Sequence, residues 1–329
     1  MRIAVLGAGA WGTAIAGALC NRHEVRLWSR DPGAARAMHA TRRNARYLPS
    51  FELPAALGIS GDLDATLAHA REGLALLAVP TASLGSLARA LRDRAFAADC
   101  AWLCKGLDRA TQRLPHEIFA AEAPQLRAGP LSGPSFADEV ARGLPTALVM
   151  AGDAPLCERV TRTLHGGNLR IYSTDDVVGV EMGGAVKNVL AIATGISDAL
   201  VLGNNARAAL VTRGLNEARR LGEALGARAE TFMGLAGVGD VLLTCTGDLS
   251  RNRQVGLALG RGEPLEQVLA RLGHVAEGVW SAPAIAARAA ALGVEVPIIR
   301  AVCAVIEGRS GPGEAVGQLL SRDPRPERA

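Results

Sequence analysis

The sequence predicts an α/β domain with a mainly parallel sheet, followed by an all-α domain. Two patterns carry this prediction: short apolar runs separated by helical segments up to about residue 178, and purely helical periodicity beyond it. Composition agrees, because 49% apolar residues with only 3% aromatic ones suit helices packed on buried parallel strands. We therefore divide the chain into residues 1–178 and 179–329, and expect the Pro/Arg-rich tail from about residue 323 to be disordered.

The first strand and its following turn indicate a Rossmann-like, dinucleotide-binding domain. After the apolar strand Arg2–Leu6, Gly7, Gly9 and Gly12 stand at the G-x-G-x-x-G spacing and open a helix to Leu19. Gly7 permits a tight turn, Gly9 lets backbone amides approach a pyrophosphate, and Gly12 allows close helix packing. A plain glycine-rich turn is the alternative, but the strand and helix around the motif favour the anion site at the helix N-terminus.

The tip of the second predicted strand, His23–Trp28, bears on the choice of cofactor. An acid at this point would bind the ribose of NAD, but Ser29 and Arg30 occupy the tip. Because a guanidinium suits a 2'-phosphate, we expect NADPH to be preferred. Asp31 keeps NADH as an alternative cofactor.

The next segments complete the predicted sheet. RRNARYLPSFELP contains two prolines, which exclude a long helix, and we expect an irregular flap there. Residues 73–80 form a buried strand, residues 83–94 a helix and residues 99–103 another strand. Lys105 follows that strand, at the sheet edge where ligands bind in open α/β folds. A glycine-proline turn between later strands brings Gly133 and Ser135 to the same edge, as donors or as parts of a structural turn.

Lysine is rare in this chain: Lys105 and Lys187 are the only lysines among 36 basic residues. Arginine stays protonated, whereas a buried lysine can give up a proton. The segment Gly179–Leu200 has helical periodicity, and Lys187 shares with Gly184 a face of small residues that a ligand or another element would approach closely. A solvated lysine is the alternative. We expect both lysines to point into one crevice, with the helix capped by the polar residues 173–176.

A second anion site is predicted in the stretch from Leu235 to Gly256. Glycines on either side of Val238 present Asp240 on a tight loop, and Ser250 is a candidate N-cap with Arg251 and Asn252 in the first helical turn. A helix N-terminus with an arginine and an amide suits a phosphate. An ordinary cap with solvated arginines is the alternative.

Charge and cysteine usage exclude other classes. The net charge of +4 comes from arginines scattered among acids, so we expect an anionic small molecule and no nucleic acid. The six cysteines show no C-x-x-C pair and do not cluster with the six histidines. We therefore expect free thiols, no metal site, a cytoplasmic location and no stable membrane insertion.

Several longer motifs are more specific. In order along the chain stand GAGAWGTA, NARYLP, LSGPSFADE, EMGGAVKNVLAIATGISDAL, NNARAALVTRGLNE, LAGVGDVLLTCTGDLSRN and AEG. In these segments, which reach to about Pro297, the chain resembles the bacterial NAD(P)-dependent glycerol-3-phosphate dehydrogenases. The resemblance implies a homodimer that interconverts dihydroxyacetone phosphate and sn-glycerol 3-phosphate for phospholipid synthesis.

The resemblance also implies roles for matching residues. It makes Lys187 the catalytic acid/base, with Asp240 orienting its ammonium group. It assigns to the cofactor Ala10, Trp11, Arg30, Lys105, Ala137, Arg251, Val275 and Glu277. It assigns to the substrate Lys105, Gly133, Ser135, Lys187, Asp240, Ser250, Arg251 and Asn252.

Two alternatives remain at this stage. Other two-domain dehydrogenases act on hydroxyacyl, phosphogluconate or nucleotide-sugar substrates, and the nucleotide-sugar oxidisers need a nucleophilic cysteine, for which Cys245 is the candidate. A non-catalytic dinucleotide sensor would keep the glycine turn but would need neither Lys187 nor the group from Ser250 to Asn252. The joint presence of these residues favours an enzyme.

Overall fold

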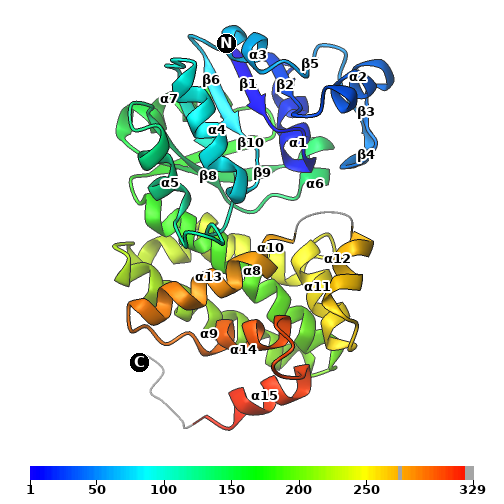
Figure 1. Cartoon of the computed structure of the whole chain (residues 1–329), viewed down its shortest axis with the longest axis vertical. Helices are drawn as coiled ribbons and strands as arrows, with labels where there is room; N and C mark the ends of the chain where they lie inside the picture. The colour runs from blue at the N-terminus through cyan, green and yellow to red at the C-terminus, as the bar shows by residue number, and fades with distance from the viewer. Residues whose placement is uncertain (273–275, 323–329) are drawn as a thin grey trace.

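The structure of the protein is a computed structural model that describes residues 1–272 and 276–322. Figure 1 shows two bodies along the long axis: the strands with helices α1 to α7 at one end, and helices α8 to α15 at the other. The predicted fold class, a Rossmann-like domain followed by an all-α domain, is confirmed. Val275 and the tail from residue 323, for which we predicted cofactor binding and disorder, lie outside the described residues.

Eight strands form the main sheet in the order β10-β9-β8-β7-β6-β1-β2-β5. They are β1 (Arg2–Leu6), β2 (Glu24–Trp28), β5 (Gly58–Ser60), β6 (Leu74–Leu77), β7 (Asp99–Trp102), β8 (Ala128–Ser132), β9 (Thr146–Ala151) and β10 (Leu169–Thr174). Adjacent strands are parallel except β8 and β9, which are antiparallel. This exception arises because their connection holds only the five-residue helix α6 (Ala137–Ala141), too short to carry the chain back along the sheet.

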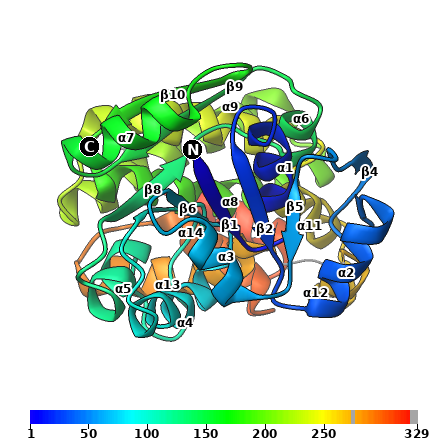
Figure 2. The ribbon, with the colours of Figure 1, turned by 90° about the horizontal axis from the view of Figure 1, so that it is seen from above.

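Helices cover both faces of this sheet. They are α1 (Ala10–Leu19), α2 (Pro32–Thr41), α3 (Leu63–His69), α4 (Thr81–Asp93), α5 (Pro115–Glu122) and α7 (Ala154–Leu164). Strand β1 shows the two faces: Ile3 and Val5 pack in a cluster with residues of α1 and α7, while Ala4 and Leu6 pack with residues of α3, α4 and α5. Figure 2 shows these two groups of helices on opposite sides of the strands.

The segment from Arg42 to Pro54 is not the irregular flap that we predicted. It forms an antiparallel hairpin of β3 (Arg43–Asn44) and β4 (Leu48–Glu52). The two prolines exclude a helix but not a short two-stranded hairpin, since strands outside a larger sheet tolerate proline. Buried Asn44 donates through Nδ2 to the Ala8 carbonyl at 2.9 Å and to the Thr13 hydroxyl at 2.8 Å, so the hairpin braces the glycine turn.

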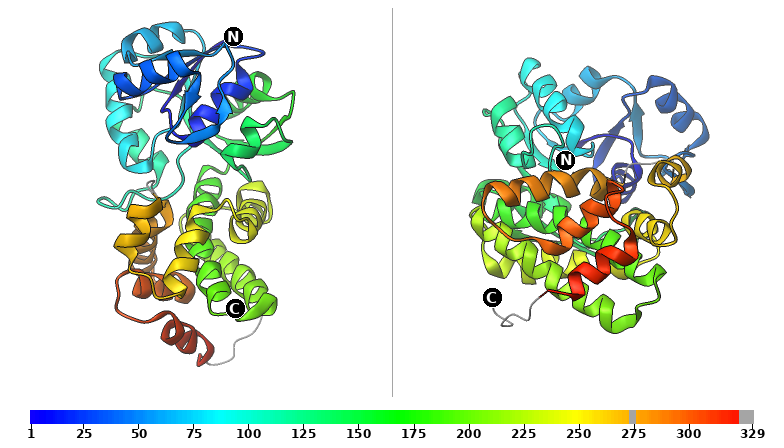
Figure 3. Two further views of the ribbon diagram at one scale, coloured as in Figure 1. Left: turned by 90° about the vertical axis from the view of Figure 1, so that its right-hand side faces the viewer. Right: turned by 60° about the horizontal axis from the view of Figure 1, so that its bottom comes forward.

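The C-terminal body consists of helices. They are α8 (Val177–Ala199), α9 (Gly203–Ala224), the 3₁₀ turn η1 (Ala229–Met233), the π turn η2 (Leu235–Gly239), α10 (Asp240–Thr246), α11 (Arg251–Gly260), α12 (Leu265–Leu272), α13 (Glu277–Ala291), α14 (Pro297–Ile306) and α15 (Pro312–Leu320). Figure 3 shows them from two further directions, with α15 far from the sheet. Helix α8 supplies nine residues of their shared core, from Met182 to Ile196.

Helix α8 is the central element of this body. As predicted, it is capped by the polar segment before it, since the Asp176 carboxylate accepts from the Gly179 amide at 2.8 Å. Among the described helices it is the one that is long and apolar enough to cross a membrane. However, 83% of its most apolar 18-residue stretch is buried inside the protein. Its packing is close: a Cβ on Gly195 would lie 2.3 Å from the Arg253 carbonyl oxygen, and one on Gly256 2.1 Å from that of Ile192. Glycine thus lets the backbones of α8 and α11 touch.

Candidate active site

Both lysines of the chain bind one carboxylate. Asp240 accepts from Lys187 Nζ at 2.9 Å through Oδ1 and from Lys105 Nζ at 2.6 Å through Oδ2. Each ammonium has one further acceptor: the Thr244 hydroxyl lies 3.0 Å from Lys187 Nζ, and the Gly133 carbonyl oxygen 3.1 Å from Lys105 Nζ. The two lysines therefore meet at one point, as their positions in the sequence predicted.

This cluster is almost dry. The side chains of Lys187, Lys105 and Asp240 are 11%, 10% and 1% exposed. Two ammonium groups on one carboxylate leave a net charge of about +1 at the site, which attracts an anion and strengthens its binding in a medium of low polarity. Burial lowers the pKa of Lys105 to about 8, although Asp240 opposes this shift, and the Lys187 ammonium adds to it.

The small face of α8 lets the two bodies meet at this point. A Cβ on Gly184 would lie 3.2 Å from the Ser132 hydroxyl oxygen and 3.3 Å from Lys105 Cγ, and one on Gly183 2.3 Å from the Ala236 carbonyl oxygen. Gly184 thus faces the sheet body, and Gly183 faces η2. The face that the sequence marked as small is therefore one that other elements approach closely.

We predicted Asp240 on a tight loop, but it is the first residue of α10. The π turn η2 precedes it, and a Cβ on Gly237 would lie 2.0 Å from the Phe232 carbonyl oxygen. Glycine there lets the chain coil tightly enough to run directly into a helix. The helix also holds Thr244 one turn later, on the same face, where its hydroxyl donates to the Asp240 carbonyl at 2.6 Å.

The predicted N-terminus of α11 is present. Ser250 is its N-cap and accepts from the Arg253 amide at 3.3 Å. Arg251 is exposed. Asn252 is buried and links two helices, because its Nδ2 donates to Asn188 Oδ1 at 2.9 Å and its Oδ1 accepts from the Gly278 amide at 3.0 Å.

Glu277 begins α13 and faces the cationic cluster. Burial raises the pKa of its carboxyl, while Arg251, Lys187 and Lys105 favour the charged form. Glu277 is thus within electrostatic reach of both lysines and of Arg251 at the start of α11.

The glycine turn has the geometry that a dinucleotide requires. Gly7 has a φ of +123°, and a Cβ there would lie 2.4 Å from the Ala78 carbonyl oxygen. A Cβ on Gly12 would lie 2.0 Å from the Gly7 carbonyl oxygen, whereas one on Gly9 would meet no protein atom within 4 Å. Gly9 is the N-cap of α1 and provides no side-chain cap, so the first-turn amides can receive an anion.

Other residues expected to bind the cofactor lie around this turn. Ala10 and Trp11 are the first residues of α1. Trp11 and Ala137 of α6 pack on one small apolar cluster. Arg30 is exposed just beyond β2, the strand next to β1.

The turn after β8 fits the structural turn that was one of the two alternatives. Gly133 has a φ of +130° and acts as an acceptor, through its carbonyl oxygen. That oxygen receives Lys105 Nζ and also the Ser135 hydroxyl at 3.1 Å. The Ser135 hydroxyl is thus engaged within the turn in this structure.

Sequence reasoning missed three residues at these sites. Thr244 binds Lys187, Asn188 adjoins Lys187 and binds Asn252, and Asn44 braces the glycine turn. Thr244 and Asn188 carried a local signal, since each lies in a motif that we quoted, close to Asp240 or Lys187. Asn44 lies in NARYLP, but nothing local shows that its partners are 31 and 36 residues earlier.

Cys245 does not suit a nucleophile. It is fully buried in the core of the helical body, and burial raises the pKa of its thiol to about 12. A thiolate is the reactive form, so this environment suppresses reactivity. All six cysteines are free, as predicted.

Comparisons with known proteins agree along the whole chain. The family described as NAD-dependent glycerol-3-phosphate dehydrogenase matches in its N-terminal part at residues 2–156 and in its C-terminal part at residues 176–317. A glycerol-3-phosphate dehydrogenase [NAD(P)+] of Methylibium petroleiphilum is 56% identical over 99% of this chain and 98% of its own. One from Herminiimonas arsenicoxydans is 55% identical over the full length of both chains. The crystal structure of glycerol-3-phosphate dehydrogenase from Coxiella burnetii is 42% identical, with a TM-score of 0.92 over 98% of this chain and 99% of that one.

Proposed function

Because the chain belongs to the NAD-dependent glycerol-3-phosphate dehydrogenase family, we propose that Lys187 is the proton donor of its reaction. The protein is an oxidoreductase that uses a nicotinamide cofactor to reduce dihydroxyacetone phosphate to sn-glycerol 3-phosphate. The observation that carries the proposal is the pair of buried lysines on Asp240.

The residues of the sheet body fit a dinucleotide. The bare N-terminus of α1 and the open space at Gly9 would accept the pyrophosphate, with Ala10 and Trp11 supplying the first-turn backbone. We assign Arg30, Ala137, Arg251 and Glu277 to the same proposed cofactor site. When bound, the reduced nicotinamide supplies the hydride that the carbonyl carbon of the substrate receives.

The N-terminus of α11 would hold the phosphate of the substrate. Arg251 is exposed and charged, and the first-turn amides behind the Ser250 cap point to the same end of the helix. Asn252 has one of its two Nδ2 hydrogens engaged with Asn188, which leaves the other for a phosphate oxygen. Binding the phosphate there fixes the carbonyl group near Lys187.

Lys187 can then act as a general acid. Its ammonium has three N–H donors, of which Asp240 and Thr244 receive two, leaving the third for the carbonyl oxygen of the substrate. Donation of that proton neutralises the oxygen as it becomes a hydroxyl. Lys105 has the same pattern, with Asp240 and Gly133 as acceptors, and would hold the substrate oxygen or phosphate by charge. General acid catalysis of this kind contributes about 10² to 10⁴ in rate.

The finer features of the enzyme are proposals as well. Exposed Arg30 beyond β2 supports a preference for NADPH over NADH, since a guanidinium pairs with the 2'-phosphate. We further propose a homodimer in the cytoplasm that works without membrane insertion, and a division of the chain near residue 178. The free thiols support a reducing compartment.

The test is the rate of NADPH oxidation with dihydroxyacetone phosphate, run beside NADH and beside unphosphorylated dihydroxyacetone. We expect turnover that depends on the phosphate and is faster with NADPH at low cofactor concentration. Arg30→Ala should then remove the NADPH advantage, a loss of about tenfold, and leave the NADH rate unchanged. An unchanged cofactor ratio in Arg30→Ala would show that another residue reads the 2'-phosphate, and equal rates with both ketones would overturn the phosphate site.

A further inference from the structure

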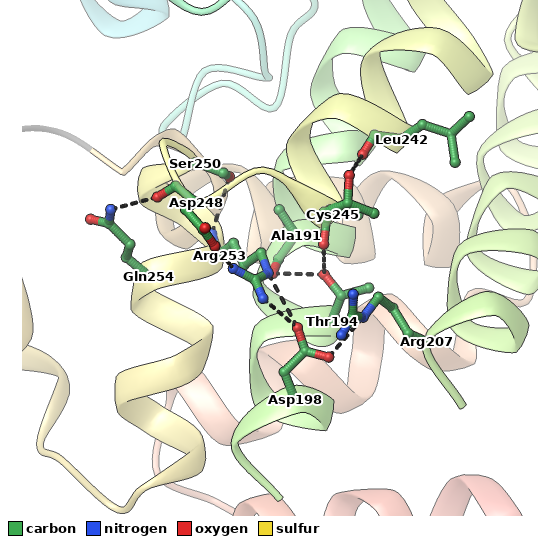
Figure 4. Close-up of polar contacts among 11 residues, drawn as sticks. Ala191, Thr194, Asp198, Arg207, Leu242, Cys245, Asp248, Ser250, Arg253 and Gln254 are labelled. Atoms are coloured by element: carbon green, nitrogen blue, oxygen red, sulfur yellow. Dashed lines mark hydrogen bonds and ion pairs between the residues drawn. The ribbon is translucent and has the colours of Figure 1, made fainter. Parts of the chain in front are cut away.

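Partly buried ion pairs join the first turn of α11 to the last turn of α8 (Figure 4). Asp198 Oδ2 accepts from Arg253 Nη2 at 2.8 Å and from Arg253 Nε at 3.2 Å. Asp198 Oδ1 accepts from Arg207 Nε at 2.8 Å. The side chains of Arg253 and Asp198 are only 12% and 10% exposed, so this pair is shielded from solvent and fixes a definite geometry.

Arg253 also holds the segment that leads into α11. Its Nη1 donates to Asp248 Oδ1 at 2.9 Å, and its amide donates to the Ser250 hydroxyl at 3.3 Å. Gln254 Nε2 adds a bond to the Asp248 carbonyl at 2.8 Å. One guanidinium therefore ties both the capping segment and the first turn of α11 to α8.

The partner on α8 lies on the same helix face as Lys187. Asp198 is 11 positions after Lys187, which is about three turns and about 16 Å along the helix. Between them Thr194 donates to the Cys245 carbonyl at the end of α10, at 3.4 Å. One straight face of α8 thus binds α10 near Lys187 and α11 near Asp198.

We propose that Arg253 is a positioning residue that acts through Asp198. The pair sets the N-terminal turn of α11 at a fixed place along α8, and so fixes the distance between the phosphate site and the Lys187 ammonium. This inference rests on the proposed function, in which Ser250, Arg251 and Asn252 bind the phosphate. Arg253 itself points to α8 and to Asp248, and touches the substrate in no step.

A buried pair of this kind contributes orientation more than stability, because the cost of removing two charges from water offsets much of their attraction. Contact between α8 and α11 at Gly195 and Gly256 remains when the pair is removed. The helix would stay in place while its first turn loses its fixed position. A misplacement of about 1 Å in an oriented site can cost about a hundredfold in rate.

The experiment compares Arg253→Met with Arg261→Met in the full-length enzyme. Arg261 stands at the other end of α11 and pairs with Glu263 on the surface, so it controls for the loss of an arginine from this helix. At saturating NADPH, kcat and KM are measured for dihydroxyacetone phosphate, and kcat/KM for unphosphorylated dihydroxyacetone. We expect Arg253→Met to lower kcat/KM for dihydroxyacetone phosphate about tenfold to a hundredfold. Its kcat/KM for unphosphorylated dihydroxyacetone should change less than about threefold, and Arg261→Met should match the wild type with both ketones.

Equal losses with both ketones would show a general structural role and overturn the inference, as would an unchanged kcat/KM for dihydroxyacetone phosphate. If Arg253→Met does not fold, Asp198→Asn removes the charge at constant shape and carries the same expected split and the same overturning results. Arg251→Ala separates this inference from the proposed function. An unchanged KM for dihydroxyacetone phosphate in Arg251→Ala would refute the phosphate site itself, whereas a raised KM there with a normal Arg253→Met would refute only the positioning role.

Discussion

Two helix N-termini of this protein are proposed to bind phosphate groups, and they are built differently. The N-terminus of α1 has three glycines in and before its first turn, one of which is the cap. Its site therefore consists of backbone and open space. The N-terminus of α11 has a serine cap, an arginine and an asparagine, and an ion pair ties it to α8. The sheet body would thus bind its ligand by shape, whereas the helical body would bind by side-chain charge.

A third N-terminus shows what happens when the chain supplies the acceptor itself, here a carboxyl group. Glu217 of α9 accepts from the Ile298 amide at 2.8 Å and from the Ile299 amide at 3.3 Å, at the start of α14. That helix end is satisfied internally and buried. A helix N-terminus becomes available to a ligand only where no carboxylate of the chain occupies it, and the bare cap of α1 meets this condition.

The largest effect is expected from Lys187→Arg in the helical body. The variant keeps the positive charge, but arginine does not give up a proton at ordinary pH. If the helical body needs a proton donor at this position, the retained charge cannot replace it. We expect kcat to fall by about 10² to 10⁴, measured by NADPH oxidation at saturating substrate. Arg219→Lys, an exchange on the surface of α9, serves as the control. Near-normal turnover in Lys187→Arg would mean that only charge is required.

A matched pair of glycine variants tests the backbone site at α1. Gly9→Ala adds a Cβ that meets no protein atom within 4 Å, whereas the Cβ of Gly12→Ala would lie 2.0 Å from the Gly7 carbonyl oxygen. Both should weaken NADPH binding about tenfold to a hundredfold, measured by fluorescence titration. Only Gly12→Ala should also lower the free energy of unfolding, by about 1–3 kcal/mol. Normal NADPH affinity in Gly9→Ala would place the pyrophosphate elsewhere.

The pH dependence of activity tests the charge at the helical site. Burial lowers the pKa of Lys105 to about 8, with Asp240 opposing and Lys187 reinforcing the shift. The Lys105 ammonium, which we propose to attract the substrate, is therefore lost as the pH rises through 8. We expect kcat/KM for dihydroxyacetone phosphate to be level below this pH and to fall about tenfold per pH unit above it. A profile that stays level to pH 10 would contradict this, and NADPH affinity over the same range shows whether the cofactor site titrates instead.

The smallest effect is expected at the N-terminus of α14, where Glu217 makes stability depend on pH. Burial raises the pKa of Glu217 from 4.5 to about 7, against the two amide bonds that lower it. The folded protein therefore holds this proton more tightly than the unfolded chain. This raised pKa contributes up to about 3 kcal/mol to the free energy of unfolding. The contribution is complete below about pH 4.5 and is lost as the pH rises through 7.

Glu217→Gln should remove this dependence, so that the free energy of unfolding changes less between pH 5 and pH 8 than in the wild type. Chemical denaturation at several pH values measures it, and Glu223→Gln on the exposed face of α9 is the control. The same slope in the wild type and in Glu217→Gln would show that Glu217 titrates normally.

The sequence by itself determined the features that depend on local spacing. The strand Arg2–Leu6 and the helix that ends at Leu19 agree with the predicted bounds, because glycine spacing and apolar runs act within a few residues. The same holds for the Ser250 cap and for the long helix that carries Lys187. The meeting of the two lysines was also predictable, since the carboxyl edge of a parallel sheet collects the residues that follow its strands.

Only the tertiary structure decided how these pieces bind one another. Lys105 and Asp240 are 135 residues apart, and no local pattern shows that a single carboxylate lies between both lysines. The hairpin that braces the glycine turn, the antiparallel β8 and β9, and the link from Arg253 to Asp198 are likewise contacts between distant segments. Local spacing fixes which face a side chain occupies, but its partner depends on which elements pack against that face, and burial then sets the charge and pKa of the group.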